Sequence, residues 1–203
     1  MVLHPHTLAQ ARKEFSMKNK LFPISLASVI ILYLLTVPAQ GQETVGVFEQ
    51  PLLITSAGQN AEVQIAAVLA KRAGLSYTLS KQAGGADLQG MKTLVLVLGA
   101  SLKGLGAAGL DLDKERDRVK DLLDAAQKNQ APVLCLHLGG EVRRGEQTDD
   151  LIAGILPLAK MLIVVKSGNA DGFFTKICQA KGIPLVEVEK TADAQTPLRQ
   201  AFK

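Results

Sequence analysis

The side chains best suited to chemistry in this sequence gather around glycine-rich stretches. Arg143 and Arg144 end the stretch HLGGEVRR, and their planar guanidinium groups suit a carboxylate, phosphate or sulfate ligand. His137, which opens the same stretch, is a candidate general base because imidazole titrates near neutral pH. A neutral, hydrogen-bonded position near the core explains this histidine, the only one after residue 41, equally well. Lys103 adds a further cation inside the stretch GASLKGLGAAG.

The stretch GLGAAG, residues 104–109, matches the letters of a dinucleotide fingerprint but not its context. Such a fingerprint needs its first glycine at the strand end and the helix directly after it. Here we expect a loop, with the next helix beginning at residue 113, and His137 stands where the ribose-binding acid belongs. The glycines either form a nest of backbone N–H groups for an anion or serve a flexible loop. We expect no cofactor, since FMN rests on fold analogy alone and few aromatic residues are available to stack on it.

An enzymatic role stays open at the level of the sequence. Residues 99–103, GASLK, differ at one position from the nucleophile-elbow pattern G-x-S-x-G, because Lys103 stands where the second glycine belongs. Ser56 or Ser101 could combine with His137 and an acid such as Asp171 or Glu141, although the chain order differs from that of known hydrolase triads.

No metal site is expected, because the one histidine after residue 41 and the scattered acids do not have zinc-ligand spacing. Cys135 and Cys178 lie in apolar runs, which favours two buried thiols over a disulfide.

From residue 51 onward, strand-like and helix-like patterns alternate. Continuous aliphatic runs predict strands covered on both faces, and apolar residues at helical spacing predict amphipathic helices. We therefore expect a doubly wound, mainly parallel α/β sheet of five or six strands, a flavodoxin-like three-layer sandwich with the second strand at one edge and the third beside the first. The expected strands span 51–55, 75–79, 93–98, 133–138, 161–165 and 185–189, and the expected helices 62–73, 113–130, 148–156, 171–181 and 193–202.

This fold predicts where a ligand site must lie. In open α/β sheets, ligands bind outside the carboxyl ends of the strands, where the strand order reverses. The four segments expected there are rich in glycine and polar residues, whereas the loops at the opposite edge are ordinary helix ends and strand starts. Helix capping explains Asn60 and Asp171. The expected ligand-binding residues are Ser56, Gly58, Gln59, Gly99, Ser101, Lys103, Gly104, Gly106, His137, Gly139, Gly140, Glu141, Arg143, Arg144, Lys166, Ser167, Gly168 and Asn169.

An apolar run at residues 21–37, with two lysines before it and small residues after it, is typical of a secretory signal peptide. Cleavage after Ala39 or Gly41 fits the pattern, Met17 is an alternative start, and an uncleaved membrane anchor is the alternative reading. We expect export to the periplasm or the cell exterior. The expected organisation is an N-terminal extension and signal peptide at 1–41, a linker at 42–50 and one α/β domain at 51–203.

The charge balance argues against a nucleic-acid partner. The chain has 23 basic and 19 acidic side chains, but from Gln42 onward the numbers are 19 and 18. This near-neutral part has no Trp and no basic stretch interleaved with aromatic residues. We expect contact with a membrane only through an uncleaved signal segment, and the sequence leaves the oligomeric state open.

With these segments identified, the chain resembles a family of secreted bacterial proteins catalogued as a domain of unknown function. The resemblance covers about residues 51–202 and rests on PLLITSAGQNAE, LGASLKGLGAAGLD, HLGGEVRRG and VVKSGNADGFFTKI. It implies an exported α/β domain and brings no activity, ligand or catalytic residue with it.

Three functional hypotheses follow from the sequence. The first is an exported domain that binds a small anionic or polar molecule at the carboxyl edge of its sheet. The second is a cell-envelope hydrolase or transferase that uses His137. The third is an interaction module without a ligand, for which we expect an exposed apolar patch.

Overall fold

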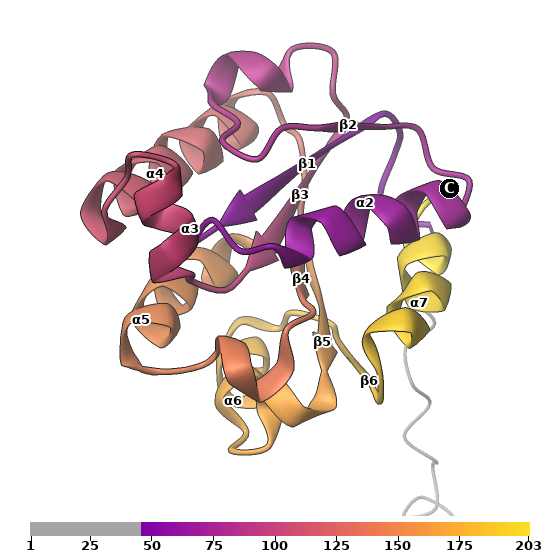
Figure 1. Cartoon of the computed structure of the whole chain (residues 1–203). Helices are drawn as coiled ribbons and strands as arrows, with labels where there is room; N and C mark the ends of the chain where they lie inside the picture. The colour runs from indigo at the N-terminus through magenta and orange to yellow at the C-terminus, as the bar shows by residue number, and fades with distance from the viewer. Residues whose placement is uncertain (1–45) are drawn as a thin grey trace, which may run out of the picture. The chain divides into compact units, whose positions relative to one another are not determined.

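The aliphatic runs of the sequence form the centre of a parallel sheet (Figure 1). The computed structural model describes residues 46–203, and within them six strands lie in the order β2-β1-β3-β4-β5-β6, with every neighbouring pair parallel. This is the flavodoxin-like order, so the expected fold is confirmed. The strands are β1 (Leu52–Ala57), β2 (Tyr77–Leu79), β3 (Thr93–Leu98), β4 (Val133–His137), β5 (Met161–Val165) and β6 (Leu185–Val188).

Helices cover both faces of this sheet, which makes three layers. Alternate side chains of the central strands pack on one face against α4, α5 and α6 and on the other against α2 and α7 (Figure 1). Every residue of β1, β3, β4 and β5 is buried, as continuous aliphatic runs predict. The helices are α2 (Glu62–Arg72), α3 (Leu102–Ala107), α4 (Leu112–Lys128), α5 (Glu146–Ile155), α6 (Phe173–Lys181) and α7 (Gln195–Gln200).

The expected loop at 99–112 is wrong in one respect, because it contains the short helix α3. Ser101 caps this helix by accepting a hydrogen bond from Gly104 N at 3.1 Å, and Leu105 is buried beneath it. The two leucines of LKGLGA point to a helix, but the intervening glycines mask the signal because glycine disfavours helices in isolation. The GLGAAG letters therefore belong mainly to a helix rather than to an open anion-binding loop.

The ends of other elements also differ from expectation. Strand β1 continues to Ala57, so Ser56 lies inside a buried strand and not in a loop. Helix α6 begins at Phe173, two residues later than expected, because Lys166–Asn169 forms a 3-10 turn. Asn60 does not cap α2, whose N-cap is Ala61.

The first described residues belong to the packed domain. Phe48, in the expected linker, is fully buried, and its ring lies 5.7 Å from that of Phe202. Backbone hydrogen bonds tie the same two segments, with Phe48 N donating to Ala201 O at 2.9 Å and Lys203 N donating to Phe48 O at 3.1 Å. The domain therefore begins before residue 51.

The expected signal peptide and the alternative start at Met17 fall in residues 1–45, outside the described part of the chain. Among residues 46–203, no helix is both long enough and apolar enough to cross a bilayer.

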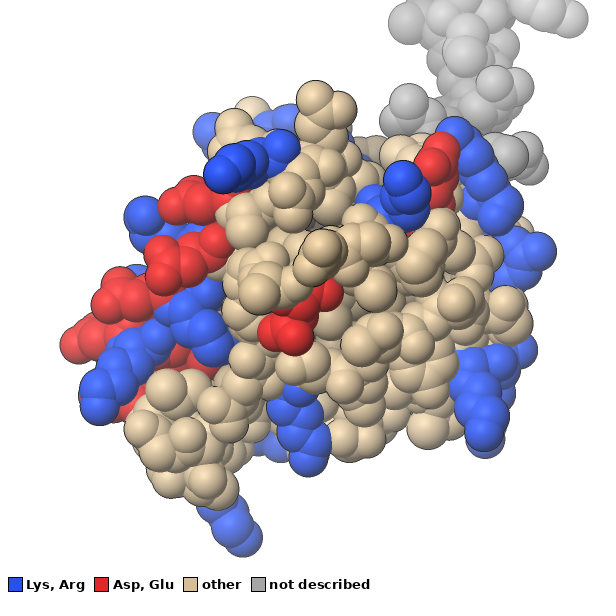
Figure 2. Space-filling model, turned by 90° about the horizontal axis from the view of Figure 1, so that it is seen from above, with Lys and Arg blue, Asp and Glu red and all other residues tan. Residues whose placement is uncertain are grey.

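One face of the surface shows how charge is distributed (Figure 2). Acidic and basic side chains alternate over α4 at the left of this view, whereas the rest of the face is mostly tan, with basic side chains mainly around its margin. On α4, Arg116 pairs with Asp113 at 3.0 Å and Lys120 with Asp124 at 3.1 Å. The charges of this helix therefore neutralise one another locally.

Candidate functional site

The four glycine-rich segments meet at the carboxyl edge of the sheet. The segments after β1 and β3 are joined by a backbone hydrogen bond from Ser101 N to Gly58 O at 2.8 Å. The segments after β4 and β5 form the 3-10 turns Gly140–Arg143 and Lys166–Asn169, which contact each other. The edge is therefore built of closely packed loops.

Close packing explains several of the edge glycines. Gly58 has a φ of +109°, and a Cβ there would collide with the backbone of Gly99. A Cβ on Gly104 of α3 would collide with the carbonyl oxygen of Gln59. A Cβ on Gly140 would strike the hydroxyl of Ser167. These glycines allow neighbouring loops to touch, so their abundance alone does not indicate a ligand.

A buried ion pair that the sequence analysis missed holds the segment after β1. The Glu115 carboxylate is fully buried and accepts hydrogen bonds from Gly58 N at 2.7 Å and Gln59 Nε2 at 3.1 Å. Arg118 binds the same carboxylate at 2.7 Å and donates to Ser56 O at 2.6 Å. Glu115 stands four residues before the buried Val119 on one helix face, which is the signal that could have identified it.

His137 has no ring nitrogen left to face a substrate. Its side chain is fully buried, with Nδ1 3.2 Å from Leu98 O and Nε2 3.0 Å from Gly140 O. The ring lies 4.9 Å from that of Phe174, and a Cβ on Gly168 would approach it to 2.7 Å. Burial lowers the pKa of His137, and the two carbonyl contacts oppose that shift only in part. A neutral imidazole has one N–H, so only one of the two carbonyl contacts is a hydrogen bond while the ring is uncharged. In either tautomer the buried ring holds the loops after β3 and β4 together.

Arg144 joins three segments of the domain. It binds both carboxylate oxygens of Asp149, at 2.7 and 3.0 Å, and lies 3.0 Å from the Asp171 carboxylate. Its guanidinium carbon lies 4.4 Å from the ring centre of Phe173 and 5.3 Å from that of Phe174. The hydrogen bond to Asp149 raises the pKa of Arg144, and Arg144 lowers the pKa of Asp171 to about 2. Arg144 is therefore already occupied by internal partners.

Arg143 differs from Arg144, because most of its guanidinium group is uncommitted. Among the described residues it makes one hydrogen bond, from Nε to Glu62 Oε1 at 2.8 Å, and both Nη atoms lack an acceptor. Its stem lies against Gly99, where a Cβ would approach Arg143 Cβ to 3.2 Å, and against Gly139, where a Cβ would collide with it.

Two buried acceptors without a donor lie beside Arg143. Asn60 Nδ2 donates to Val97 O and Gly99 O, both at 2.8 Å, but its Oδ1 has no partner among the described residues. Glu62 Oε2 is likewise buried and without a partner. Such groups are rare in folded proteins because an unmade hydrogen bond is costly. We call Asn60, Glu62 and Arg143 the Arg143 cluster.

The remaining expected site residues fall outside this cluster. A hollow of about 580 Å³ at the ends of β5 and β6 is lined by Lys166, Ser167, Asn169 and two glutamates, so it does not favour an anion. The hydrogen bond to Glu189 at 2.8 Å raises the pKa of Lys166. The Asn169 side chain is fully used, in part by accepting from Phe174 N at 2.9 Å. Three further expected residues are exposed and line none of the hollows described here: Lys103, Gly106 and Glu141.

Both cysteines are free and buried, and burial raises the pKa of Cys178 to about 11. Residues 46–203 contain no group of three ligating side chains that could hold a metal ion.

Residues 49–202 match a family model described as Domain of unknown function (DUF6305). The search for curated relatives finds no match. A GDSL-like lipase from Bacteroides thetaiotaomicron VPI-5482 is similar at 12% identity, with a TM-score of 0.33 over 67% of this chain and 66% of the lipase chain. A protein of the G-D-S-L family from Desulfitobacterium hafniense DCB-2 is similar at 12% identity, with a TM-score of 0.31 over 67% and 75%.

The chain thus spans just under two thirds of the lipase, at 66%. At these identities and TM-scores the likenesses carry no argument about activity, and the site must be interpreted from its own geometry.

Proposed function

The chain belongs to the DUF6305 family, and because this membership brings no activity, we propose from the geometry that the domain binds a small polar molecule at the Arg143 cluster without transforming it. The ligand carries an anionic group for Arg143 and at least one hydrogen-bond donor for the neighbouring oxygens. An amino acid or a hydroxy acid has this combination of groups.

One observation carries the proposal: a partly exposed arginine whose Nη atoms have no protein acceptor contacts a segment with buried acceptors that have no donor. The Nη atoms of Arg143 offer a fork suited to a carboxylate or phosphate. Asn60 Oδ1 and Glu62 Oε2 need donors, and both are buried. A ligand that brings both kinds of group would satisfy all three side chains at once.

The position of the cluster supports the proposal. It lies at the carboxyl ends of β1, β3 and β4, beside the point where the crossovers leave the sheet in opposite directions. Open α/β sheets bind their ligands at this point.

Arg143 controls access to the two acceptors. Its side chain is 27% exposed, while that of Glu62 is only 13% exposed. The Arg143 stem lies against Gly99 and Gly139, and Asn60 Nδ2 lies near Gly99 as well, so we expect a ligand to approach Asn60 as the Arg143 side chain rotates outward. Arg143 ends a 3-10 turn at the surface, where such a rotation leaves the sheet undisturbed.

The alternative of a hydrolase or transferase that uses His137 has less support. The ring is buried with both nitrogens against backbone carbonyls, and the hydroxyl of Ser56 accepts from Asn60 N at 2.8 Å. An interaction module also has less support, because the exposed large apolar side chains are dispersed over several elements, and such single residues are ordinary on protein surfaces.

Thermal unfolding of the full chain in the presence of amino acids, hydroxy acids, dicarboxylates and phosphate tests the proposal. A ligand at one hundred times its Kd adds about 2.7 kcal/mol of stability. We expect Arg143→Ala and Glu62→Gln each to remove the stabilisation. Arg116→Ala, which alters an exposed arginine on α4, is the matched control and should keep it.

Arg144 is unsuitable for this test because its loss would loosen the loops themselves. Binding that persists undiminished in Arg143→Ala would contradict the proposal. Absence of stabilisation by every compound that combines an anionic group with a donor would do the same.

A further inference from the structure

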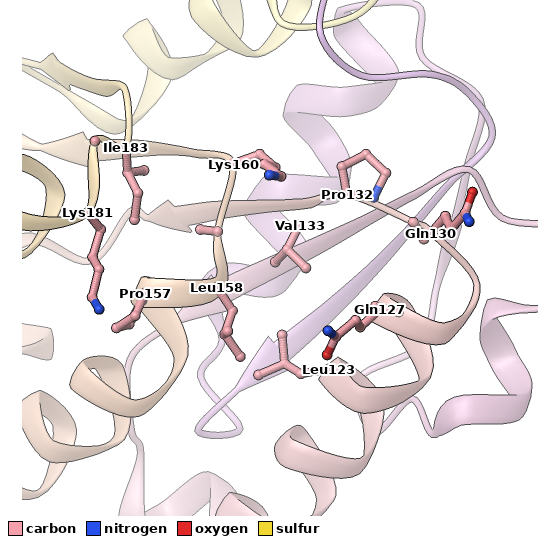
Figure 3. A pocket seen from close by; sticks show the side chains of 14 residues that line it. Leu123, Gln127, Gln130, Pro132, Val133, Pro157, Leu158, Lys160, Lys181 and Ile183 are labelled. Atoms are coloured by element: carbon pink, nitrogen blue, oxygen red, sulfur yellow. The ribbon is translucent and has the colours of Figure 1, made fainter.

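A cavity of about 500 Å³ lies at the amino edge of the sheet, opposite the Arg143 cluster (Figure 3). It opens where β4, β5 and β6 begin, between the end of α4 and the 3-10 turn Leu156–Leu158. The side chains of Leu123, Val133 and Leu158 point into the same space (Figure 3). Its size is within the usual range of small-molecule pockets.

The rim of this cavity is cationic. Lys160 and Lys181 line it from different segments and lie apart around its mouth (Figure 3). Both are exposed, and neither forms an ion pair with any described residue. No acidic side chain lines the cavity, and Gln127 and Gln130 supply its other polar groups.

The apolar wall continues beyond the cavity. A second hollow of about 240 Å³ lies between α4 and α5 and shares Leu123 and Leu158 with the first. Val119, Leu151 and Ile155 extend its apolar lining, and Leu158 is 57% exposed between the two hollows. The charged residues at the outer margin include Lys120 and Asp124, which neutralise each other at 3.1 Å. We call the two hollows together the amino-edge track.

One residue that lines the second hollow is a glycine without an evident structural reason. Gly154 lies inside α5 and lines the hollow, yet a Cβ there would meet nothing within 4 Å. Its φ is ordinary, so neither packing nor backbone conformation requires a glycine, which costs a helix about 1 kcal/mol relative to alanine. The edge glycines Gly58 and Gly104, by contrast, have evident steric reasons. Gly154 therefore leaves open space in the wall of the second hollow.

We propose that the amino-edge track binds an amphiphilic carboxylate, an unbranched hydrocarbon chain that ends in one carboxylate group. The carboxylate lies at the rim, in the positive field of Lys160 and Lys181, and the hydrocarbon chain passes Leu158 into the hollow beside Gly154. The cationic rim of the first hollow, whose lining contains no acid, matches the carboxylate, and the apolar wall shared by the two hollows matches the hydrocarbon chain. The acids of the track, Asp124 and Asp150, lie in the second hollow, away from the expected position of the carboxylate. This site is separate from the Arg143 cluster.

Isothermal titration calorimetry of the full chain with octanoate, decanoate and dodecanoate, each below its micelle concentration, tests the proposal. Affinity should rise with chain length, by up to about fourfold for each additional buried methylene. Decanol, which lacks the charge, should bind at least about tenfold more weakly than decanoate, a difference equivalent to one strong charged contact.

Variants separate the two parts of the track. The double variant Lys160→Gln/Lys181→Gln should lower decanoate affinity about tenfold and leave decanol binding unchanged. Gly154→Leu places a side chain in the hollow, where its Cβ meets nothing within 4 Å, so dodecanoate should bind this variant no better than octanoate does. Gly106→Leu on α3, where a Cβ also meets nothing, and Lys71→Gln on α2 are matched controls that should bind like the wild type.

Absence of saturable binding by all three carboxylates would overturn the proposal. Equal affinity for decanol and decanoate, or an unchanged chain-length dependence in a folded Gly154→Leu variant, would also overturn it. Self-association of the chain that the lysine and glycine variants abolish would assign the track to a second copy instead. Arg143→Ala should not affect carboxylate binding, so this result is independent of the function proposed above.

Discussion

At the scale of single residues, the two adjacent arginines have different tasks. Arg144 is held by Asp149, Asp171 and two phenylalanine rings, whereas Arg143 keeps most of its guanidinium group for a ligand. The sequence identified both as candidates because of their chemistry. It could not separate them, because their partners depend on tertiary packing. The Arg143 partner Glu62 lies 81 residues away in the chain.

The same limit applies to the buried polar residues. Glu115 and Arg118 look like two more charges on an amphipathic helix until the helix is placed against the segment after β1. Asn60 was expected to cap α2, but its side chain bridges to β3 instead. Residue types and strand ends can be read from sequence, whereas the direction of each side chain requires the fold.

His137 should make stability depend on pH. Because burial lowers its pKa, the unfolded chain takes up a proton at a higher pH than the folded protein does. Stability from this group is present above the ordinary histidine pKa of about 6.5 and is lost as pH falls, by at most about 1.4 kcal/mol per pH unit. Urea unfolding of the full chain between pH 7.5 and 5.5 measures the loss.

Ring resonances of His137 followed by NMR give its pKa in the folded state directly. A value at or above 6.5 would contradict the lowered pKa and the pH dependence expected from it, because it would mean that the two carbonyls stabilise the cation more than burial disfavours it.

At the scale of elements, the alternation of aliphatic runs and amphipathic helices was sufficient to predict the sheet. Strands such as TLVLVL are covered on both faces, so their composition alone identifies them. Helix α3 was missed because LKGLGA contains two glycines, and its stability comes from the capping Ser101 and the buried Leu105. The helix propensity of the residues does not include the stabilisation that capping and burial provide in the folded protein.

The two glycines of α3 should respond in opposite ways to alanine. Gly104→Ala places a methyl group against the carbonyl oxygen of Gln59, a backbone atom that cannot easily move, and should cost about 1–3 kcal/mol. Gly106→Ala meets open space and should stabilise the protein by about 0.5 kcal/mol through helix propensity. Chemical denaturation of both variants provides the comparison, and equal effects would show that α3 does not pack against this segment.

At the scale of the whole molecule, the first and last segments of the domain pack against each other. Phe48 and Phe202 are both buried and in contact, and the backbone of each segment bonds to the other. The sequence favoured a linker at 42–50 because this stretch lacks a periodic pattern. A single anchoring aromatic residue has no period, so pattern analysis cannot detect it.

Phe48→Ala should lower the free energy of unfolding by about 3–5 kcal/mol, because it empties a fully buried site. Val47→Ala is the natural control, since Val47 is 52% exposed and its loss should cost less than about 0.5 kcal/mol. Guanidinium unfolding of the full chain followed by circular dichroism compares them. Similar midpoints for the two variants would mean that this segment does not belong to the folded unit.

Because the two ends of the domain lie together, the order in which its βα units are synthesised could be changed without changing their arrangement in space. Gly46 N donates to Gln200 O at 3.1 Å, so the start and finish of the domain lie within a hydrogen bond of each other. A short covalent link there would make the backbone a closed ring without moving a strand. Such a ring could be opened in an exposed loop elsewhere, giving a circular permutant in which another βα unit is synthesised first.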